Sequence, residues 1–196
     1  MSAAADSLEV LRAAERVPVP WKNGGGLTCE VAVSPPESDL TAFDWRVSIA
    51  EIRTPGPFSL FEGIERRMAV LDGRLSLAID GRPAITLTPE TEPVAFAGDL
   101  PAVAAPLGAQ VTDLNVMTRR LRCAARLTRR SGPQSLLEPQ ADTTLLIALA
   151  ELRCRAAGTA LSLCALDALR IRRSPGCAFT IDSGSASYYL IEISEL

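Results

Sequence analysis

The amino-acid sequence predicts an all-β protein built from two similar halves. Most of the chain consists of short apolar runs that are rich in branched residues and are separated by Gly, Pro, Asp or Ser. This pattern is typical of strands and turns. Two Asp-Gly pairs, at 72–73 and 80–81, lie between apolar runs and predict hairpins. A third observation is that one stretch of the chain resembles a later one.

The expected strands follow one another with few interruptions. Near the N-terminus, residues 7–17 (SLEVLRAAERV) contain good helix formers but also fit a strand followed by a single turn, and both alternatives stay open. The other expected strands lie at 27–34, 45–52, 67–79 with a turn inside, 84–88, 94–98, 109–117, 144–152, 160–171 and 188–196.

The internal similarity joins residues 71–90 (LDGRLSLAIDGRPAITLTPE) to residues 149–168 (LAELRCRAAGTALSLCALDA). With one gap, Leu71 aligns with Leu149. Two copies of a strand, turn and strand suggest two β-barrel or jelly-roll halves that bury their cores at a shared face.

The similarity also sets the expected domain boundaries. The chain has 196 residues, which is enough for one large domain or two small ones. We expect an N-terminal half over 1–118, an Arg-rich connection over 119–142 and a C-terminal half over 143–196.

Composition narrows the classes of partner and location. The net charge is -3 with both signs scattered, so no nucleic-acid partner is expected. The longest apolar run, 145–150, is too short to span a bilayer, and the N-terminus does not resemble a signal peptide. Five widely spaced cysteines fit reduced thiols. We expect a cytoplasmic protein without a membrane partner, and a homodimer is compatible with the sequence.

The chain contains no histidine. This absence removes the commonest general base, the Ser-His and Cys-His nucleophile pairs, and the usual ligands of zinc, iron, copper and nickel. No carboxylate cluster with calcium-loop spacing replaces them. We therefore expect no metal and no cofactor, and the sequence leans against an enzyme without deciding the matter.

The stretch PWKNGGGLTCE, residues 20–30, holds the only lysine of the chain, Lys22. Three consecutive glycines allow positive φ and close approach of backbone N–H groups to a ligand, and Lys22 adds an ammonium group. The loop therefore suits an anionic oxygen ligand, but a tight turn with an exposed lysine is an equal alternative. The candidate ligand-binding residues here are Lys22, Asn23, Gly24, Gly25, Gly26 and Thr28.

Two expected strands carry polar residues in period two. In 45–52, Arg46 and Ser48 share one face, where an arginine can hold a carboxylate through both oxygens. In 112–120, Asp113, Asn115 and Met117 share one face and resemble the wall of a polar cavity. Solvent-facing strands are the alternative in both cases.

A resemblance to a known family rests on three stretches. These are PWKNGGGLTCEVAVSP (20–35), FDWRVSIAEIRTPGPFSLFEGIERRMAVLDG (43–73) and TDLNVMTRR (112–120). Together they resemble the HutD/Ves family of cupin-like proteins over about the first two thirds of the chain. The resemblance implies a two-cupin fold, with jelly-roll halves in one chain. It also implies a link to histidine utilisation, where a small acidic intermediate such as N-formylglutamate or urocanate is the proposed ligand, or a stress-related role.

Two departures from the family and cupin patterns limit what carries over. The family segment S-x-F-P-G-x-D-R stands here as SLFEGIER, with Glu62 in place of Pro and Glu65 in place of Asp. The histidine-based metal signature of enzymatic cupins has no counterpart. Metal-dependent chemistry is therefore not expected, and the histidine pathway is a family-level expectation.

Three functions stay open. The first is a metal-free protein that binds a small acidic metabolite in a regulatory or stress-related role. The second is a metal-free isomerase, lyase or hydrolase in which Asp113 is the base and Lys22 stabilises an oxyanion. The third is a structural or interaction protein. The candidate ligand-binding set is completed by Arg46, Ser48, Phe61, Asp113, Asn115 and Met117. In 56–67, Phe58 and Phe61 either close an apolar lid or are core residues.

Overall fold

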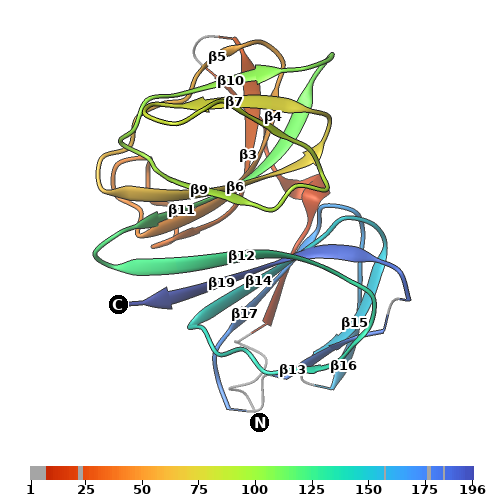
Figure 1. Ribbon diagram of the computed structural model, residues 1–196. Helices are drawn as coiled ribbons and strands as arrows, with labels where there is room; N and C mark the ends of the chain where they lie inside the picture. Colours follow the sequence, from red (N-terminus) through yellow and green to blue (C-terminus); the bar gives the residue numbers. More distant parts are fainter. Residues whose placement is uncertain (1–7, 22–23, 157, 176–177, 183) are drawn as a thin grey trace. The chain divides into compact units, whose positions relative to one another are not determined.

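The computed structural model describes residues 8–21, 24–156, 158–175, 178–182 and 184–196 (Figure 1). Nearly all regular structure is strand, which confirms the all-β prediction. The chain divides into two compact units. The N-terminal unit comprises Arg16–Ala124 with Leu196, and the C-terminal unit comprises Ala125–Glu195 with the described residues before Arg16.

Two sheets form the N-terminal unit. The larger has the order β2-β3-β4-β11-β6-β9, and the smaller has the order β5-β10-β7-β8. The strands are β2 (Val19–Pro20), β3 (Gly26–Ser34), β4 (Trp45–Ile52), β5 (Gly56–Pro57), β6 (Ile64–Asp72), β7 (Leu75–Ile79), β8 (Ile85–Leu87), β9 (Val94–Ala97), β10 (Ala102–Pro106) and β11 (Val111–Arg119).

The C-terminal unit also has two sheets, with the orders β1-β17-β14-β19-β12 and β13-β18-β15-β16. Its elements are β1 (Leu8–Leu11), a 3-10 turn (Ala13–Glu15), β12 (Cys123–Ser131), β13 (Gln134–Leu137), β14 (Thr143–Ala148), β15 (Leu152–Ala156), β16 (Thr159–Leu163), β17 (Ala168–Arg172), β18 (Phe179–Ile181) and β19 (Ser187–Glu195). The first of these strands and the turn after it agree with the strand alternative for residues 7–17.

The two units repeat one topology. The order β4-β11-β6-β9 in the first unit corresponds to β12-β19-β14-β17 in the second, and β5-β10-β7-β8 corresponds to β13-β18-β15-β16. Every counterpart therefore follows eight strands later in the chain. The similarity seen in the sequence falls on β7 and β8 and on β15 and β16, which agrees with a duplicated fold. Hydrogen bonding over the described residues leaves two separate sheets in each unit and does not close a barrel.

The division into units differs from the expected boundaries. The segment 119–142, expected to be a connection, contains β12 and β13. Along β12 only Cys123 and Leu127 are buried, while the arginines are exposed or half-buried, so its strand pattern was hidden by charge. The first strand also joins the C-terminal unit, because β1 pairs with β17 from Leu8 opposite Ile171 onward.

One of the two expected hairpins forms. Asp80-Gly81 lies between β7 and β8, which pair antiparallel, and Gly81 has φ +74. Asp72-Gly73 instead joins β6 to β7, which belong to different sheets, so the hairpin prediction was wrong there. Gly73 is required because its φ is +85 and a Cβ atom would lie 2.6 Å from the carbonyl oxygen of Gln110.

Each unit has its own apolar core between its sheets. The C-terminal core is apolar apart from one tyrosine hydroxyl, and its buried members are Leu146, Ala148, Leu152, Cys154, Ala156, Leu163, Leu169, Ile171, Phe179, Ile181, Tyr188 and Leu190. The N-terminal core consists of Ile52, Met68, Val70, Leu75, Leu77, Ile79, Leu87, Phe96, Ala102, Ala104 and Val111. The polar residues of interest share strand faces with this second group.

Candidate functional site

Polar side chains gather on the inward face of the larger N-terminal sheet. Alternate residues of a strand point to the same side. On β4, β6 and β11 the core residues Ile52, Met68 and Val111 therefore fix which side chains face inward. The inward polar set is Arg46 and Ser48 on β4, Arg66 on β6, and Asp113 and Asn115 on β11. The face assignments expected from period two in β4 and β11 are confirmed.

Arg66, Asn115 and Asp113 form a buried chain of hydrogen bonds. The Nε and Nη2 atoms of Arg66 donate to Oδ1 of Asn115 at 3.3 and 3.0 Å. The Nδ2 atom of Asn115 donates to Oδ2 of Asp113 at 2.5 Å. The amide therefore lies between a buried cation and a buried carboxyl and fixes the orientation of both groups.

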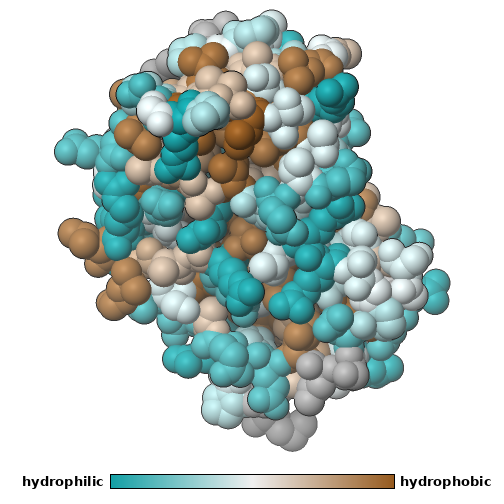
Figure 2. Space-filling view, viewed as in Figure 1, coloured by the Kyte–Doolittle hydropathy of each residue, from teal (hydrophilic) through white to brown (hydrophobic). Residues whose placement is uncertain are grey.

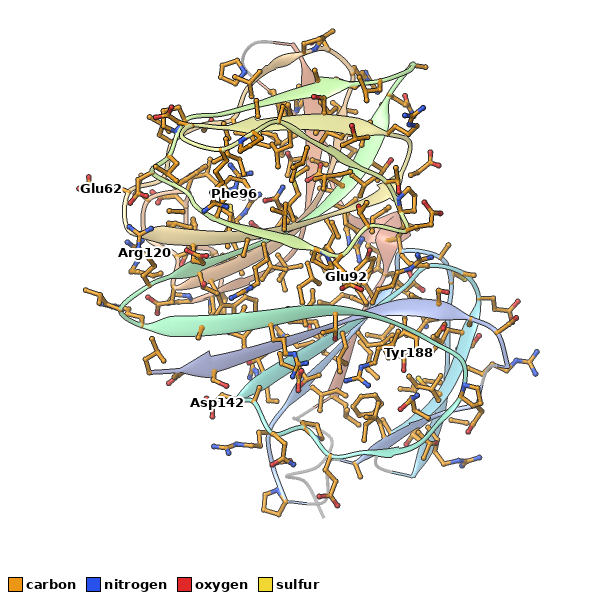
Figure 3. The ribbon with its side chains drawn as sticks, viewed as in Figure 1. Glu62, Glu92, Phe96, Arg120, Asp142 and Tyr188 are labelled. Carbon is orange, nitrogen blue, oxygen red and sulfur yellow. The ribbon has the colours of Figure 1, made fainter. Side chains whose placement is uncertain are left out.

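Two phenyl rings cover the guanidinium of Arg66. Its Cζ atom lies 4.5 Å from the centroid of Phe58 and 5.1 Å from that of Phe96, which are cation–π distances. Figure 3 labels Phe96, which extends from β9 into the interior of the unit. Burial lowers the pKa of Arg66 to about 10, while the charge of Asp113 opposes the shift. Arg66 therefore remains a cation at neutral pH.

The carboxyl of Asp113 is 0% exposed, and its Oδ1 atom has no hydrogen-bond partner among the described residues. Burial raises its pKa to about 7, while the charge of Arg66 and the hydrogen bond from Asn115 act in the opposite direction. A carboxyl with this pKa exchanges a proton near neutral pH. It is the one group of the buried chain that can do so.

A second arginine lies on the same face. Arg46 pairs across the sheet with Met117, and Arg66 pairs with Met117 from the other side, so the two arginine Cα atoms lie roughly 10 Å apart. The Nε atom of Arg46 is 2.8 Å from Oε2 of Glu30 on β3. The Arg46 side chain is only 14% exposed. Ser48 is buried and lies opposite Asn115.

Residues 21–25, which form the glycine loop, connect β2 to β3. The backbone N–H of Trp21 donates to the Gly26 carbonyl at 3.0 Å, and that of Gly24 donates to the Trp21 carbonyl at 2.9 Å. The indole Nε1 of Trp21 donates to Thr28 Oγ1 at 2.7 Å. The Gly24 amide therefore already has a backbone acceptor, and the Thr28 hydroxyl on β3 accepts the indole N–H. The anion contact expected from Gly24 stays a prediction.

Of the other candidate residues here, two lie outside the described residues and two are buried glycines. Lys22 and Asn23 lie outside the described residues. Gly25 and Gly26 are buried, and the Gly25 carbonyl accepts the N–H of Arg53 at 2.9 Å. Tight packing explains Gly26, since a Cβ atom there would lie 2.3 Å from the carbonyl oxygen of Glu51.

Phe61 and Met117, both expected at the ligand site, belong to a small apolar cluster. Its buried members are Val33, Phe43, Ile64 and Met117, and Phe61 packs against them. The rings of Phe61 and Phe43 have centroids 6.4 Å apart. This location agrees with the core alternative for Phe61.

The two arginines that end the D-x-N-x-M-x-R-R signature hold loops in place. Arg119 donates to the carbonyls of Phe43 and Thr41 at 3.1 and 3.0 Å. Arg120 forms an ion pair with Asp99 and donates to a backbone carbonyl. These contacts explain the two residues without a ligand.

Sequence reasoning missed Arg66 and did not connect Phe96 or Glu30 with the site. The signal available was alternation in β6, which places Arg66 on the face of Met68. The partners of Arg66 come from segments up to 49 positions away in the sequence, so no local pattern contains the cluster.

The C-terminal unit does not repeat this cluster. The alignment of Leu71 with Leu149 makes Val70 the counterpart of Ala148. The strand pairing in each unit then identifies the other matching positions. The counterparts are Tyr188 for Asp113, Leu190 for Asn115 and Thr144 for Arg66. Tyr188, labelled in Figure 3, is buried, and its hydroxyl has no hydrogen-bond partner among the described residues.

Other kinds of site find no support in the described part of the chain. It contains no group of three His, Cys, Asp or Glu side chains placed to hold a metal ion. No helix in it is long and apolar enough to cross a membrane. Exposed apolar side chains such as Leu121 occur, and Figure 2 shows apolar residues dispersed among hydrophilic ones on the face in view.

Comparison with known proteins finds similar sequences in the HutD family and among proteins named Ves. A model of the HutD family matches residues 13–189. An uncharacterised 21.2 kDa protein from the hutC 3' region of Pseudomonas putida is 39% identical over 142 residues, which cover 72% of this chain and 73% of that protein. The Ves protein of Citrobacter koseri is 42% identical over 109 residues, covering 55% of this chain and 56% of that one.

Solved structures similar to this chain include a HutD protein and a cupin protein. HutD from Pseudomonas fluorescens SBW25 (formate condition) has a TM-score of 0.82 at 31% identity and covers 97% of this chain and 100% of that one. A cupin 2 conserved barrel domain protein from Leptotrichia buccalis has a TM-score of 0.59 at 7% identity, covers 95% of this chain and 100% of that one, and shows the fold alone. The fold is therefore cupin-like, and by the match over residues 13–189 the chain belongs to the HutD family.

Proposed function

We propose that this protein binds a small carboxylate, without a metal, at the inward face of the N-terminal unit. The observation that carries the proposal is the buried cation Arg66, whose Nε and Nη2 atoms donate to Asn115 and whose neighbour in the same chain of hydrogen bonds, Asp113, has an Oδ1 atom without a partner among the described residues. Guanidinium groups bind carboxylates through charge-assisted hydrogen bonds, which are strongest away from water. Arg46 lies on the same face, in an ion pair with Glu30.

The family suggests which carboxylates to test. The name of the Pseudomonas putida relative places it in a hutC region, which agrees with the histidine-utilisation context implied by the resemblance. N-Formylglutamate and urocanate are therefore the first candidate ligands. The contribution of Lys22, the cytoplasmic location and a homodimer stay predictions from the sequence.

A thermal-shift screen against N-formylglutamate, urocanate, glutamate and formate tests the proposal. A ligand at about 100 times its dissociation constant adds roughly 2.7 kcal/mol to the unfolding free energy, which raises Tm measurably. The shift should vanish in Arg66→Met, which removes the charge but keeps an unbranched apolar side chain beside the rings. Arg74→Met is the matched control, because it removes an exposed arginine of the same unit. An equal shift in both variants would contradict the site, and no shift with any acid would favour an interaction protein.

One observation favours a second function. A buried carboxyl with a pKa of about 7 is suited to general base catalysis. Asp113 therefore favours a metal-free isomerase, lyase or hydrolase as the second function. Turnover of one of the same acids, abolished by Asp113→Asn, would establish this function. Binding without turnover would leave the binding protein.

A further inference from the structure

The described residues contain two buried aspartates with opposite surroundings. Asp167 accepts hydrogen bonds from Arg12 Nη1 at 2.7 Å, from the Ala13 amide at 2.7 Å and from the Cys164 amide at 2.9 Å. Asp113 accepts a side-chain hydrogen bond from Asn115, and its Oδ1 atom has no partner among the described residues. The Oδ1 atom therefore has capacity for one more hydrogen bond.

Few charged groups face Asp113. On the larger sheet they are Arg66 on β6, the Arg46–Glu30 ion pair across β4 and β3, and Arg119 at the end of β11 itself. The smaller sheet faces it with apolar side chains, namely Leu75, Leu77, Ile79, Leu87, Ala102 and Ala104. Lys22, which precedes β3, lies outside the described residues. Because Arg46 already has an acidic partner, Arg66 is the cation that balances an ionised Asp113.

We propose that the site binds its carboxylate together with one proton, which Asp113 takes up from solvent. This inference rests on the proposed function. An anion beside Arg66 would place two negative charges around one buried cation, and a low-dielectric interior disfavours that arrangement. Protonation of Asp113 restores the balance, and its new O–H group can donate to an oxygen of the ligand. In the overall process, the ligand carboxylate and one proton combine with the protein in which Asp113 is ionised. The product is a complex in which the ligand carboxylate lies beside a neutral Asp113.

The pKa of Asp113 sets the pH range in which ligand affinity should depend on pH. Burial holds the pKa of Asp113 at about 7 before any ligand binds, so near pH 7 the proton is available at little cost. Below about pH 6 Asp113 is already protonated, and affinity should not change with pH. Above about pH 7 each binding event must take one proton from solvent, so the apparent Kd should rise by up to tenfold per pH unit.

Calorimetric titration at pH 8 in HEPES and in Tris tests the inference, because the dependence of the observed enthalpy on the buffer's ionisation enthalpy gives the number of protons bound. The ligand is the acid that gives the largest thermal shift among N-formylglutamate, urocanate, glutamate and formate. Uptake should approach one proton in the native protein and zero in Asp113→Asn, whose affinity should no longer depend on pH. Asp80→Asn, at an exposed position of the same unit, should keep the native proton number.

The outcomes separate the two proposals. Binding without proton uptake in the native protein would overturn the inference and leave the proposed function standing. Undiminished uptake in Asp113→Asn would also overturn it, because another group would then be the acceptor. If none of the four acids binds the native protein, the proposed function fails and this inference fails with it.

Discussion

The guanidinium of Arg66 lies 4.5 Å from the ring centroid of Phe58, inside a unit whose neighbouring core is apolar. The side chain therefore fills space as well as carrying charge. We expect Arg66→Ala to lower the unfolding free energy by about 2–4 kcal/mol more than Arg66→Met, because alanine leaves a cavity beside the ring. Urea denaturation at pH 6, where Asp113 is mostly neutral, provides the comparison. Equal losses would show that packing at Phe58 contributes nothing.

Asp113 predicts a pH dependence of stability. Its pKa is raised from 3.8 to about 7 in the folded protein, so between these values the folded state holds more protons than the unfolded state. The unfolding free energy should therefore fall as pH rises from about 4 to 7, by on the order of a few kcal/mol, and the contribution should be constant above that range. Asp113→Asn should flatten this part of the profile relative to Asp80→Asn. A native profile that rises steadily from pH 4 to 7, unchanged in Asp113→Asn, would refute the assignment.

Gly26→Ala should destabilise the N-terminal unit by more than about 2 kcal/mol, because the new methyl group would overlap the backbone of β4. The added Cβ atom would lie 2.3 Å from the carbonyl oxygen of Glu51 and 3.2 Å from the indole of Trp21. Gly108→Ala is the matched control, since nothing lies within 4 Å of a Cβ atom there. Thermal denaturation of both variants checks the difference, and similar midpoints would contradict it.

Asp167→Ala should release the first strand of the C-terminal unit. The carboxylate of Asp167 is bound by Arg12 and by the backbone amides of Ala13 and Cys164, so it ties the segment after β1 to the loop before β17. Amide hydrogen exchange in Leu8–Leu11 should become faster, while exchange in β11 should not change. Asp142→Ala, which removes an exposed carboxylate of the same unit, serves as the control. Unchanged protection of β1 in Asp167→Ala would show that strand pairing alone holds it.

The sequence predicted the inward positions on β4 and β11 because period-two alternation is a local property of a strand. It could not predict the Arg66 cluster, whose members meet only after three strands pair. It also missed β12, where exposed arginines surround the two buried residues Cys123 and Leu127. The hairpin expected at Asp72-Gly73 was wrong because the same turn residues also serve a crossing between sheets.

One topology occurs twice in the chain, eight strands apart, but only one of the two copies has the charged cluster. Among the described residues, only the first copy combines a buried arginine with a buried carboxyl whose Oδ1 atom has no hydrogen-bond partner. At the matching positions the other copy has Tyr188, Leu190 and Thr144 in place of the charged cluster. If the proposed site is correct, a chain with two copies of the topology therefore offers one binding site instead of two.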